Sequence, residues 1–598
     1  MSTLAFLDTP PRFVFFTGKG GVGKTSVACA TAIRLAHNGK RVLLVSTDPA
    51  SNVGQVLGVV IGNTITPIPQ VAGLSALEID PEHAASAYRE RIIAPVRNLL
   101  PAAEIALMTE QLSGSCTTEV ASFNEFTDLL ANPEFTADYD HVIFDTAPTG
   151  HTIRLLQLPG SWTDFLNEGK GDASCLGPLS GLEKQRATYA RAVDALKDPA
   201  VTRLVLVSRA QKSSLAEAAR TLSELATIDN ACTNLVINGV LPATGETGSS
   251  DTVSGDDKLT TAIRSRESAA IAGMPPALAA LTADLIDLKV ANMMGVEALV
   301  ELLSDSAREG MAGGGGASVM KDVIEAPHAP LRAIIDQLET DGHGLVLCMG
   351  KGGVGKTTVA AAIAVALAYR GHDVTLTTTD PAAHLSETLQ GDVPSLTVTR
   401  IDPDSATQIY RDRVMKSRGS RLDDIGKAAL WEDLQSPCTT EVAVFQQFSR
   451  AVHESKNQFV IVDTAPTGHT LLLLDAAGSY HREVARQMGD SLSYITPLMR
   501  LQDPVATKVV IVTLAEPTPV MEAAELQDDL KRAGITPFAW VVNNSIAAAR
   551  PSSPFLRQRA ANELPEIARV EALAPRVAVI PLLAEEPIGE ARLTALGR

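Results

Sequence analysis

The feature that most constrains this chain of 598 residues is that its sequence is duplicated. Three segments recur in the same order: "TGKGGVGKTSVA" at 17–28 as "MGKGGVGKTTVA" at 349–360, "VSTDPASN" at 45–52 as "TTTDPAAH" at 377–384, and "FDTAPTGHT" at 144–152 as "VDTAPTGHT" at 462–470. The order is kept while the spacing drifts, as happens when two homologous domains carry loops of different length. The sequence therefore predicts two related domains, residues 1–303 and 331–598.

Two segments lack the apolar pattern of a folded element. Residues 304–330, "SDSAREGMAGGGGASVMKDVIEAPHAP", contain four consecutive glycines and are predicted to be a flexible linker between the halves. Residues 243–258, "ATGETGSSDTVSGDDK", are rich in small polar residues and predict a mobile surface loop.

Each half contains short apolar runs of the length of buried strands. The runs are "FVFF", "VLLVS", "HVIFD", "LVLVS" and "LVIN" in the first half, and "LVLCM", "VTLTT", "FVIVD", "VVIVT" and "AWVV" in the second. Helical stretches such as "TSVACATAIRLAHNG" lie between them. Strands that are buried on both faces and alternate with helices are typical of a doubly wound α/β fold. We expect two such domains in tandem, each with a mostly parallel sheet, related by a pseudo-two-fold axis.

Composition excludes several classes of protein. The formal net charge of −18 argues against a nucleic-acid-binding surface, which needs a basic stripe. The N-terminus lacks the charged and apolar regions of a signal peptide, and no run of about 18 apolar residues predicts a membrane span. Six cysteines without a CxxC pair argue against a disulfide framework. We therefore expect a cytoplasmic protein that binds no nucleic acid.

The repeated "GKGGVGKT" fits the phosphate-loop pattern G-x-x-x-x-G-K-[ST] in both halves. Each copy follows a predicted strand and opens a helix, so its backbone N–H groups and the helix N-terminus can hold phosphate. Lys24 and Lys356 are expected to reach the β- and γ-phosphates, and Thr25 and Thr357 to bind Mg²⁺. The residues predicted to bind ATP, including one asparagine from a later strand of each half, are Gly18, Lys19, Gly20, Gly21, Val22, Gly23, Lys24, Thr25, Ser26, Asn238, Gly350, Lys351, Gly352, Gly353, Val354, Gly355, Lys356, Thr357, Thr358 and Asn543.

Two pairs of carboxylates follow the loops. Asp145 and Asp463 end predicted strands in "DTAPTG", the usual position of a Mg²⁺-holding aspartate beside a phosphate loop. Asp48 and Asp380, in "TDPA", end another predicted strand and are expected to orient the attacking water as catalytic bases. The alternative for the "DP" pair is a turn or a helix cap.

An extra lysine distinguishes these loops. With Lys19 and Lys351 the loop becomes KGGVGK, which resembles the deviant Walker A, or signature-lysine, class of ATPases. The resemblance implies that this lysine is catalytic and reaches the nucleotide of a partner, here the other half of the same chain. The alternative is a solvated surface lysine.

The phosphate loop, "TDPA" and "DTAPTGHT" together resemble the arsenite-translocating ATPase family, over nearly the whole chain. The resemblance implies a cytoplasmic ATPase that is activated by As(III) or Sb(III). It also implies a monomer with an internal pseudo-dimer, associated peripherally with the inner face of the plasma membrane. Its implied partners are a separate membrane arsenite carrier and a metallochaperone.

The same resemblance implies a metalloid site of three cysteines. The matching contexts are Cys116 in "GSCTTEVA", Cys175 in "ASCLGP" and Cys438 in "SPCTTEVAVF". As(III) and Sb(III) are thiophilic, and soft centres select thiolates. The alternative, a small buried hydrophobic side chain, is the one we expect for the other cysteines, Cys29, Cys232 and Cys348. The resemblance adds His151, His469 and Ser436 as weaker metalloid contacts, although each histidine is equally suited to a structural or relay role.

Two other functions share these motifs. One is an ATPase that targets tail-anchored membrane proteins, usually a homodimer with a CxxC zinc site and a Met-rich groove. The present chain is a fused tandem, lacks CxxC and has 12 methionines, which favours the arsenical pump. The other is a non-catalytic nucleotide switch, which would not respond to metalloid.

Overall fold

The computed structural model describes most of the chain. It covers residues 4–48, 53–97, 101, 104–105, 108–109, 112, 115–146, 179–226, 232–242, 258–304, 328–380, 385–423, 426–427, 430–431, 434, 437–465 and 496–598. The chain divides into two compact units, Met1–Ser254 with Ile263–Gly315, and Gly255–Ala262 with Gly316–Arg598. The predicted linker and the predicted mobile loop lie almost entirely outside the described residues.

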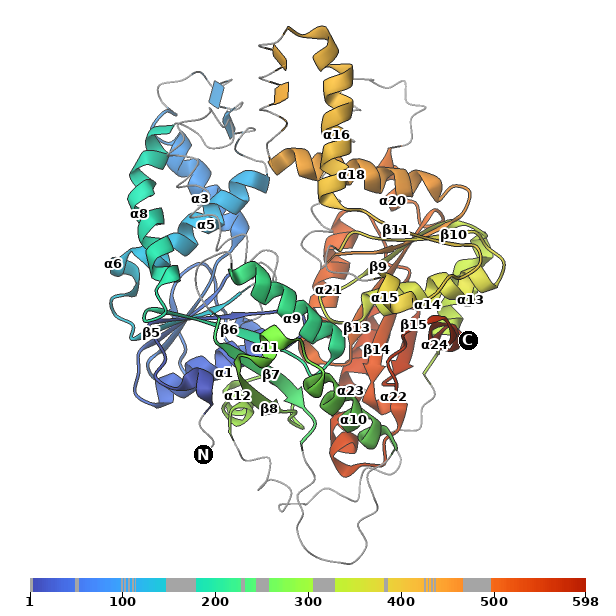
Figure 1. The fold of residues 1–598 in the computed structure, drawn as a ribbon, viewed down its shortest axis with the longest axis horizontal. Helices are drawn as coiled ribbons and strands as arrows, with labels where there is room; N and C mark the ends of the chain where they lie inside the picture. Colours follow the sequence, from blue (N-terminus) through green and yellow to red (C-terminus); the bar gives the residue numbers. More distant parts are fainter. Residues whose placement is uncertain are drawn as a thin grey trace, which may run out of the picture. The chain divides into compact units, whose positions relative to one another are not determined.

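The first unit, coloured blue to green in Figure 1, contains an eight-stranded sheet, and the strand order is β3-β4-β2-β5-β1-β6-β7-β8. Its strands are β1 (Phe13–Thr17), β2 (Val42–Ser46), β3 (Thr66–Pro67), β4 (Leu74–Glu78), β5 (His141–Asp145), β6 (Thr202–Ser208), β7 (Asn234–Val240) and β8 (Thr282–Asp287). All neighbours pair in parallel except β3, which is antiparallel to β4.

Helices connect these strands and cover the sheet. They are η1 (Ala5–Leu7), α1 (Lys24–His37), α2 (Val53–Leu57), α3 (Pro81–Ile93), α5 (Ser115–Ala131), α6 (Pro133–Thr136), α8 (Leu179–Lys197), α9 (Lys212–Leu225), α10 (Lys258–Ala272), α11 (Pro276–Ala279) and α12 (Val296–Leu302). The first turn of α10, up to Ala262, belongs to the second compact unit. On β1, Val14 and Phe16 pack in a core with α1, α2 and α12, while Phe13 and Phe15 pack in a second core with α5, α8, α9 and α11. Successive residues of a strand point to opposite faces, so an unbroken apolar run marks a sheet covered on both sides.

The second unit repeats this plan with seven strands, all parallel, in the order β11-β10-β12-β9-β13-β14-β15. They are β9 (Gly344–Met349), β10 (Val374–Thr378), β11 (Leu396–Arg400), β12 (Phe459–Asp463), β13 (Thr507–Leu514), β14 (Ala539–Ser545) and β15 (Val577–Pro581). The tandem α/β fold predicted from the sequence is therefore confirmed.

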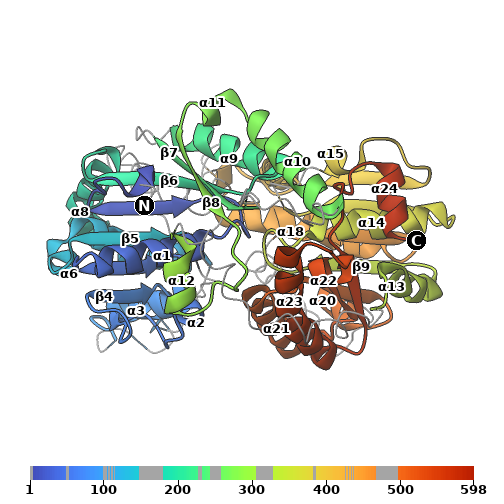
Figure 2. The same ribbon diagram turned by 90° about the horizontal axis from the view of Figure 1, so that it is seen from below.

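The helices of this unit also lie on both faces of the sheet. They are α13 (Leu331–Leu338), η5 (Glu339–Asp341), α14 (Lys356–Tyr369), α15 (Leu385–Leu389), α16 (Pro403–Ser417), η6 (Gly419–Arg421), α18 (Pro437–Glu454), α20 (Pro497–Gln502), α21 (Pro517–Arg532), α22 (Ile546–Ala549), α23 (Pro554–Leu573) and α24 (Glu590–Leu596). Helices α13, α14 and α24 share one core, and α20, α21 and α23 cover the opposite face (Figure 2). Within the described part of the chain, no helix has both the length and the apolar composition to cross a membrane.

The ten apolar runs all form strands, but the sequence analysis missed β3, β4, β8, β11 and β15. These strands lie at the edges of the sheets or next to an edge. An edge strand has a partly exposed face and needs no unbroken apolar run. Strand β11, for example, has four of its five residues exposed.

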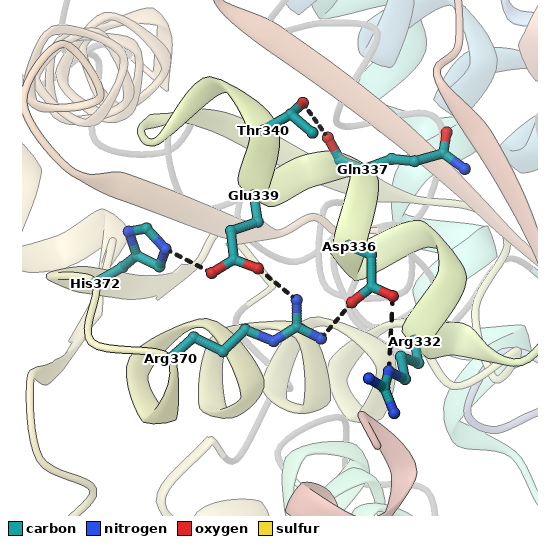
Figure 3. A network of polar contacts seen from close by, with 7 residues as sticks. All are labelled: Arg332, Asp336, Gln337, Glu339, Thr340, Arg370 and His372. Atoms are coloured by element: carbon teal, nitrogen blue, oxygen red, sulfur yellow. Dashed lines mark hydrogen bonds and ion pairs between the residues drawn. The ribbon is translucent and has the colours of Figure 1, made fainter.

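A polar network fixes the far end of the phosphate-loop helix α14 to α13, as Figure 3 shows. Arg370, which caps α14, pairs with Asp336 at 2.7 Å and with Glu339 at 2.6 Å. His372 Nε2 lies 3.0 Å from the second oxygen of Glu339, and Arg332 lies 3.6 Å from Asp336. The hydrogen bonds from His372 and Arg370 hold the pKa of Glu339 below its ordinary value of 4.5.

We predict that this network stabilises the second unit more at neutral pH than in acid. A depressed pKa in the folded state means that the contribution is present above the ordinary pKa and is lost as the pH falls. Glu339→Gln should lower the melting temperature of the second unit by about 2 °C near neutral pH, the effect of about 1 kcal/mol from a partly exposed network. Calorimetry at neutral pH and at about pH 4 measures the difference, which should be smaller at the lower pH, because the contribution is lost only as the pH falls through the lowered pKa of the folded state. Arg332→Gln, which breaks only the longer and more exposed pair, is the control. An equal shift from Glu339→Gln at both pH values would contradict the prediction.

Candidate functional site

The two phosphate loops adopt the same backbone conformation. Each joins the end of its strand, β1 or β9, to a helix that begins at the loop lysine. Gly23 and Gly355 precede these helices with φ of 88° and 92°, in the left-handed region that favours glycine. A Cβ atom at either position would also collide with the side-chain amide of an asparagine, Asn238 or Asn543. Both requirements leave only glycine at this point of the loop.

These asparagines hold the loops from strands β7 and β14, each two positions along the sheet from the strand that precedes the loop. Asn238 Nδ2, on β7, donates to the carbonyl oxygen of Val22 at 2.9 Å, and Asn543 Nδ2, on β14, donates to Val354 at the same distance. Both side chains are buried. The structure therefore brings the two predicted asparagines against the loop backbone, where they stabilise its shape.

The loop lysines lie at the first residue of each helix and are buried. Lys24 Nζ donates to the carbonyl of Lys19 at 3.3 Å, and Lys356 Nζ donates to the carbonyl of Lys351 at 2.9 Å. Each ammonium group therefore lies across its own loop. Together with the N–H groups of the helix N-terminus, it gives the loop a positive potential that suits a polyphosphate.

The predicted Mg²⁺ ligands meet in both units. Strand β5 lies between β2 and β1, and β12 between β10 and β9, so the aspartate that ends each strand lies beside the phosphate loop. Thr25 Oγ1 donates to Asp145 Oδ2 at 2.7 Å, and Thr357 Oγ1 donates to Asp463 Oδ2 at 2.8 Å. The parallel sheet thus joins two residues that are more than a hundred positions apart in sequence.

The chemistry of this pair fits Mg²⁺. Mg²⁺ prefers carboxylate and hydroxyl oxygens, and in nucleotide sites it commonly shares them with phosphate oxygens. Asp463 is 0% exposed, and its Oδ1 atom has no hydrogen-bond partner among the described residues. A buried carboxylate oxygen of this kind is suited to a cation, directly or through water.

Burial also changes the protonation of this group. It raises the pKa of Asp463 from 3.8 to about 6, although the charge of Lys356 and the hydrogen bond from Thr357 act in the opposite direction. The charge of Asp380 adds to the increase. The metal-free site therefore carries a carboxylate whose ionised form is costly at neutral pH.

The predicted catalytic aspartates lie two residues beyond their strands rather than at the strand ends, since β2 ends at Ser46 and β10 at Thr378. In the second unit, the Asp380 amide donates to Thr378 Oγ1 at 3.0 Å, and that hydroxyl donates to the carbonyl of Asp463 at 3.1 Å. Thr378 thus links the two carboxylate segments, and the sequence analysis missed it. The signal was available as a hydroxyl residue two positions before each aspartate, in "STD" and "TTD".

The early lysines differ between the units. Lys351 forms an ion pair with Glu522, a buried residue of α21 in its own unit. The matching glutamate of the first unit, Glu217 on α9, instead pairs with Arg220 at 2.6 Å. Glu522 was not predicted, because no short motif marks a helix residue so far from the loop. The trans-acting role of Lys19 and Lys351 stays a prediction.

A second buried glutamate, also missed, supports the loop after Asn543. Glu563 on α23 accepts hydrogen bonds from the hydroxyl of Ser545 at 2.8 Å and from the amides of Ile546 and Ala547 at 3.0 and 2.9 Å. Burial raises its pKa despite these three bonds. This carboxylate positions the end of β14, and therefore the asparagine that holds the phosphate loop.

Most of the residues predicted to bind metalloid lie outside the described part of the chain. Cys116 and Cys438 are the second residues of α5 and α18, so each "CTTEV" segment begins a helix. The side chains of these two cysteines are not described. The other four predicted metalloid contacts lie wholly outside the described residues: Cys175, His151, His469 and Ser436. The remaining cysteines, Cys29, Cys232 and Cys348, are buried and free, as expected.

Comparisons with known proteins agree with this arrangement. The model of the anion-transporting ATPase family matches residues 11–263, 343–501 and 474–598. An arsenical pump-driving ATPase of Escherichia coli is 56% identical over 597 residues, covering 99% of this chain and 100% of that protein. Another from Acidiphilium multivorum is 54% identical over 99% of this chain and 100% of its own length. The ATPase get3 of Schizosaccharomyces japonicus is 32% identical over only 39% of this chain and 76% of its own.

We predict that Asp463→Asn stabilises the protein in the absence of metal and nucleotide. A pKa raised in the folded state means that the stability associated with this group is present below the ordinary pKa of 3.8 and is lost as the pH rises through about 6. The variant should therefore be more stable than wild type by about 1–3 kcal/mol at about pH 8, and by less at about pH 5. Thermal unfolding in a chelator at both values measures this, with the exposed Asp528→Asn as control. A destabilised variant at the higher pH would refute the prediction.

We also predict that the asparagines contribute equally to the two nucleotide sites. Asn238→Ala or Asn543→Ala leaves a loop carbonyl without its donor and should weaken ATP binding at that site about tenfold, from a loss of about 1–1.5 kcal/mol. Titration with a fluorescent ATP analogue measures the affinity. The control is Asn544→Gly, since Asn544 is exposed and its φ of 54° suits glycine. Unchanged affinity in both alanine variants would show that the hydrogen bonds do not shape the loops.

Proposed function

Because the chain belongs to the anion-transporting ATPase family and is an ATP-hydrolysing enzyme, we propose that the anions whose transport it drives are those of trivalent arsenic and antimony. As(III) or Sb(III) binds the protein, activates hydrolysis and leaves the cell through a separate membrane carrier. The observation that carries the proposal is full-length identity of 54–56% to proteins named arsenical pump-driving ATPases. The name "pump-driving" supports a carrier distinct from the ATPase.

In this proposal each unit binds one ATP. The loop backbone holds the phosphates, and Lys24 and Lys356 neutralise charge that develops on the transferred phosphoryl group. Mg²⁺, held by Thr25 with Asp145 and by Thr357 with Asp463, would neutralise oxygens of the β- and γ-phosphates. These four residues lie in hydrogen-bonded pairs, which supports the assignment.

We propose that Asp48 and Asp380 orient the water that attacks the γ-phosphate. Each follows a strand that is directly paired to the strand of the metal-binding aspartate. The amides of Thr47 and Thr379, one residue earlier, donate to the carbonyls of Asp145 and Asp463 at 3.0 Å. A rigid link of this kind keeps a base close to the metal and the γ-phosphate, as in-line attack by water requires.

We assign the metalloid to the thiolates of Cys116, Cys175 and Cys438, with His151, His469 and Ser436 as weaker contacts. Arsenic and antimony in the trivalent state are soft and select sulfur. The position of Cys116 and Cys438 at helix N-termini supports the proposal, because such positions favour the deprotonated form of cysteine.

The cellular setting follows from the same proposal. The protein works in the cytoplasm and associates peripherally with the inner face of the plasma membrane, where the carrier receives the metalloid. A metallochaperone is a further partner that would deliver As(III) or Sb(III).

We predict that the metalloid cysteines control stimulation and not basal hydrolysis. Serine has the size of cysteine without its soft thiolate, so Cys116→Ser and Cys438→Ser should lose the stimulation of ATP hydrolysis by antimonite while keeping basal turnover. In wild type, a non-hydrolysable ATP analogue should tighten metalloid binding by about 5–150-fold, and metalloid should tighten nucleotide binding by the same factor. Steady-state turnover and equilibrium binding measure the two effects.

The matched control is Cys232→Ser. This buried cysteine donates to the carbonyl of Leu204 at 3.2 Å, a bond that a serine hydroxyl can replace. It should keep full stimulation. Full stimulation in the other two serine variants, or none in wild type, would reject the metalloid site and with it the proposed function.

A further inference from the structure

An exposed cationic segment lies in the second unit of this acidic chain. Residues 411–421, at the end of α16 and through η6, contain five arginine or lysine residues and one aspartate, whereas the whole chain has a net charge of −18. We call four of these cations the α16 tip: Arg413, Lys416, Arg418 and Arg421. All four are exposed, and α16 leads away from the sheet of its own unit (Figure 1).

The charges of the α16 tip are not neutralised locally. Within the described residues, none of the four makes an ion pair, and Arg413 donates to the neutral amide oxygen of Gln446 at 3.0 Å. The corresponding segment of the first unit differs, because Arg97, after α3, pairs with Glu90 at 2.6 Å. The corresponding residues 89–99 of the first unit contain three arginines and one glutamate, so the excess of positive charge is larger in the second unit.

Large apolar side chains are exposed on α16, in the chain that follows η6, and on α18. Ile409 is 47% exposed, Leu422 is 41%, Trp431 is 43% and Val442, on α18, is 42%. Ile409 lies four and seven residues before Arg413 and Lys416, a spacing that places the three on one stripe of the helix.

The turn and the segment that follows it are packed together. Gly419, in η6, approaches the side chains of Met415 and Leu430, and Leu430 precedes Trp431 in the chain. Leu422 lies against Gly426. Arg418, just before η6, and Arg421, within it, therefore lie close to an exposed tryptophan and an exposed leucine, held there by local packing.

We propose that the α16 tip binds the surface of an anionic phospholipid bilayer. The arginine and lysine side chains pair with lipid phosphates, and Trp431 and Leu422 enter the headgroup layer. Tryptophan favours this interfacial layer, and clustered cations beside it favour anionic lipids. The proposal rests on the proposed function only in placing the protein at a membrane, and the surface would hold the ATPase beside its carrier.

The test uses the full-length protein and vesicles without any carrier. Vesicles of phosphatidylglycerol with phosphatidylcholine are compared with phosphatidylcholine alone by co-sedimentation. Wild type should bind the anionic vesicles only, and the binding should weaken as salt is added. The triple variant Arg413→Gln, Arg418→Gln, Arg421→Gln should bind about 100-fold more weakly, at about fivefold for each cation removed.

A matched control separates the tip from net charge. Lys40→Gln, Lys197→Gln, Lys531→Gln removes three exposed cations elsewhere and should bind as wild type does. Trp431 supplies a second readout, since its fluorescence should shift to shorter wavelength on anionic vesicles, and the shift should be absent in Trp431→Phe. Equal binding by the two triple variants, or equal binding to neutral vesicles, would overturn the proposal. So would binding only to vesicles that contain a membrane protein, which would make the partner a protein.

The failure of this proposal can be distinguished from the failure of the proposed function. Antimonite-stimulated hydrolysis is measured in solution on the same tip variant, which should keep it and so demonstrate a native fold. If antimonite stimulates hydrolysis by wild type but wild type does not bind vesicles, only the lipid-binding surface is rejected. If wild type binds vesicles but antimonite does not stimulate its hydrolysis, only the metalloid function is rejected.

Discussion

The buried carboxylate at the end of the central strand is the constraint around which each unit is organised. Asp145 is 1% exposed and Asp463 is 0% exposed. An ionised carboxylate is costly in such a place unless cations and donors surround it. The loop threonine donates to it in both units, and the charge of Lys356 favours its ionised form in the second. The same features that make the group costly without a ligand suit it to the Mg²⁺ that we propose to be bound with nucleotide.

The parallel sheet creates this environment around the carboxylate. The carboxyl ends of neighbouring parallel strands share one edge, so β1 delivers the phosphate loop, β5 the aspartate, and β7 the asparagine that holds the loop. The second unit does the same with β9, β12 and β14. Covering both faces of the sheet with helices excludes water from the strands and fixes their register. Outside this edge, the packing serves to keep these three strand ends in place.

The two units are alike where nucleotide chemistry requires it and differ elsewhere. The threonine–aspartate and asparagine–carbonyl bonds occur in both, with lengths that agree within 0.1 Å. The early lysine is paired with a buried glutamate in the second unit, whereas the corresponding glutamate of the first pairs with an arginine. The excess of cations around the end of α16 is likewise larger than that around the end of α3. The sheet edge that carries the phosphate loop, the threonine and the aspartate is therefore alike in the two units, whereas the surfaces around it differ.

The sequence by itself determined the duplication, the fold class, and the loop lysine, threonine and aspartate of each unit. These features are local: a phosphate loop needs glycines at fixed spacing, and a strand covered on both faces needs an unbroken apolar run. The tertiary structure alone decided the contacts made by Glu522, Glu563 and Thr378, and which strands form the sheet edges. A buried glutamate on a helix looks like any other glutamate in sequence, because its role depends on which distant backbone groups the fold brings to it. Edge strands escaped prediction for a related reason, since one face in water relaxes the demand for apolar residues that made the central strands visible.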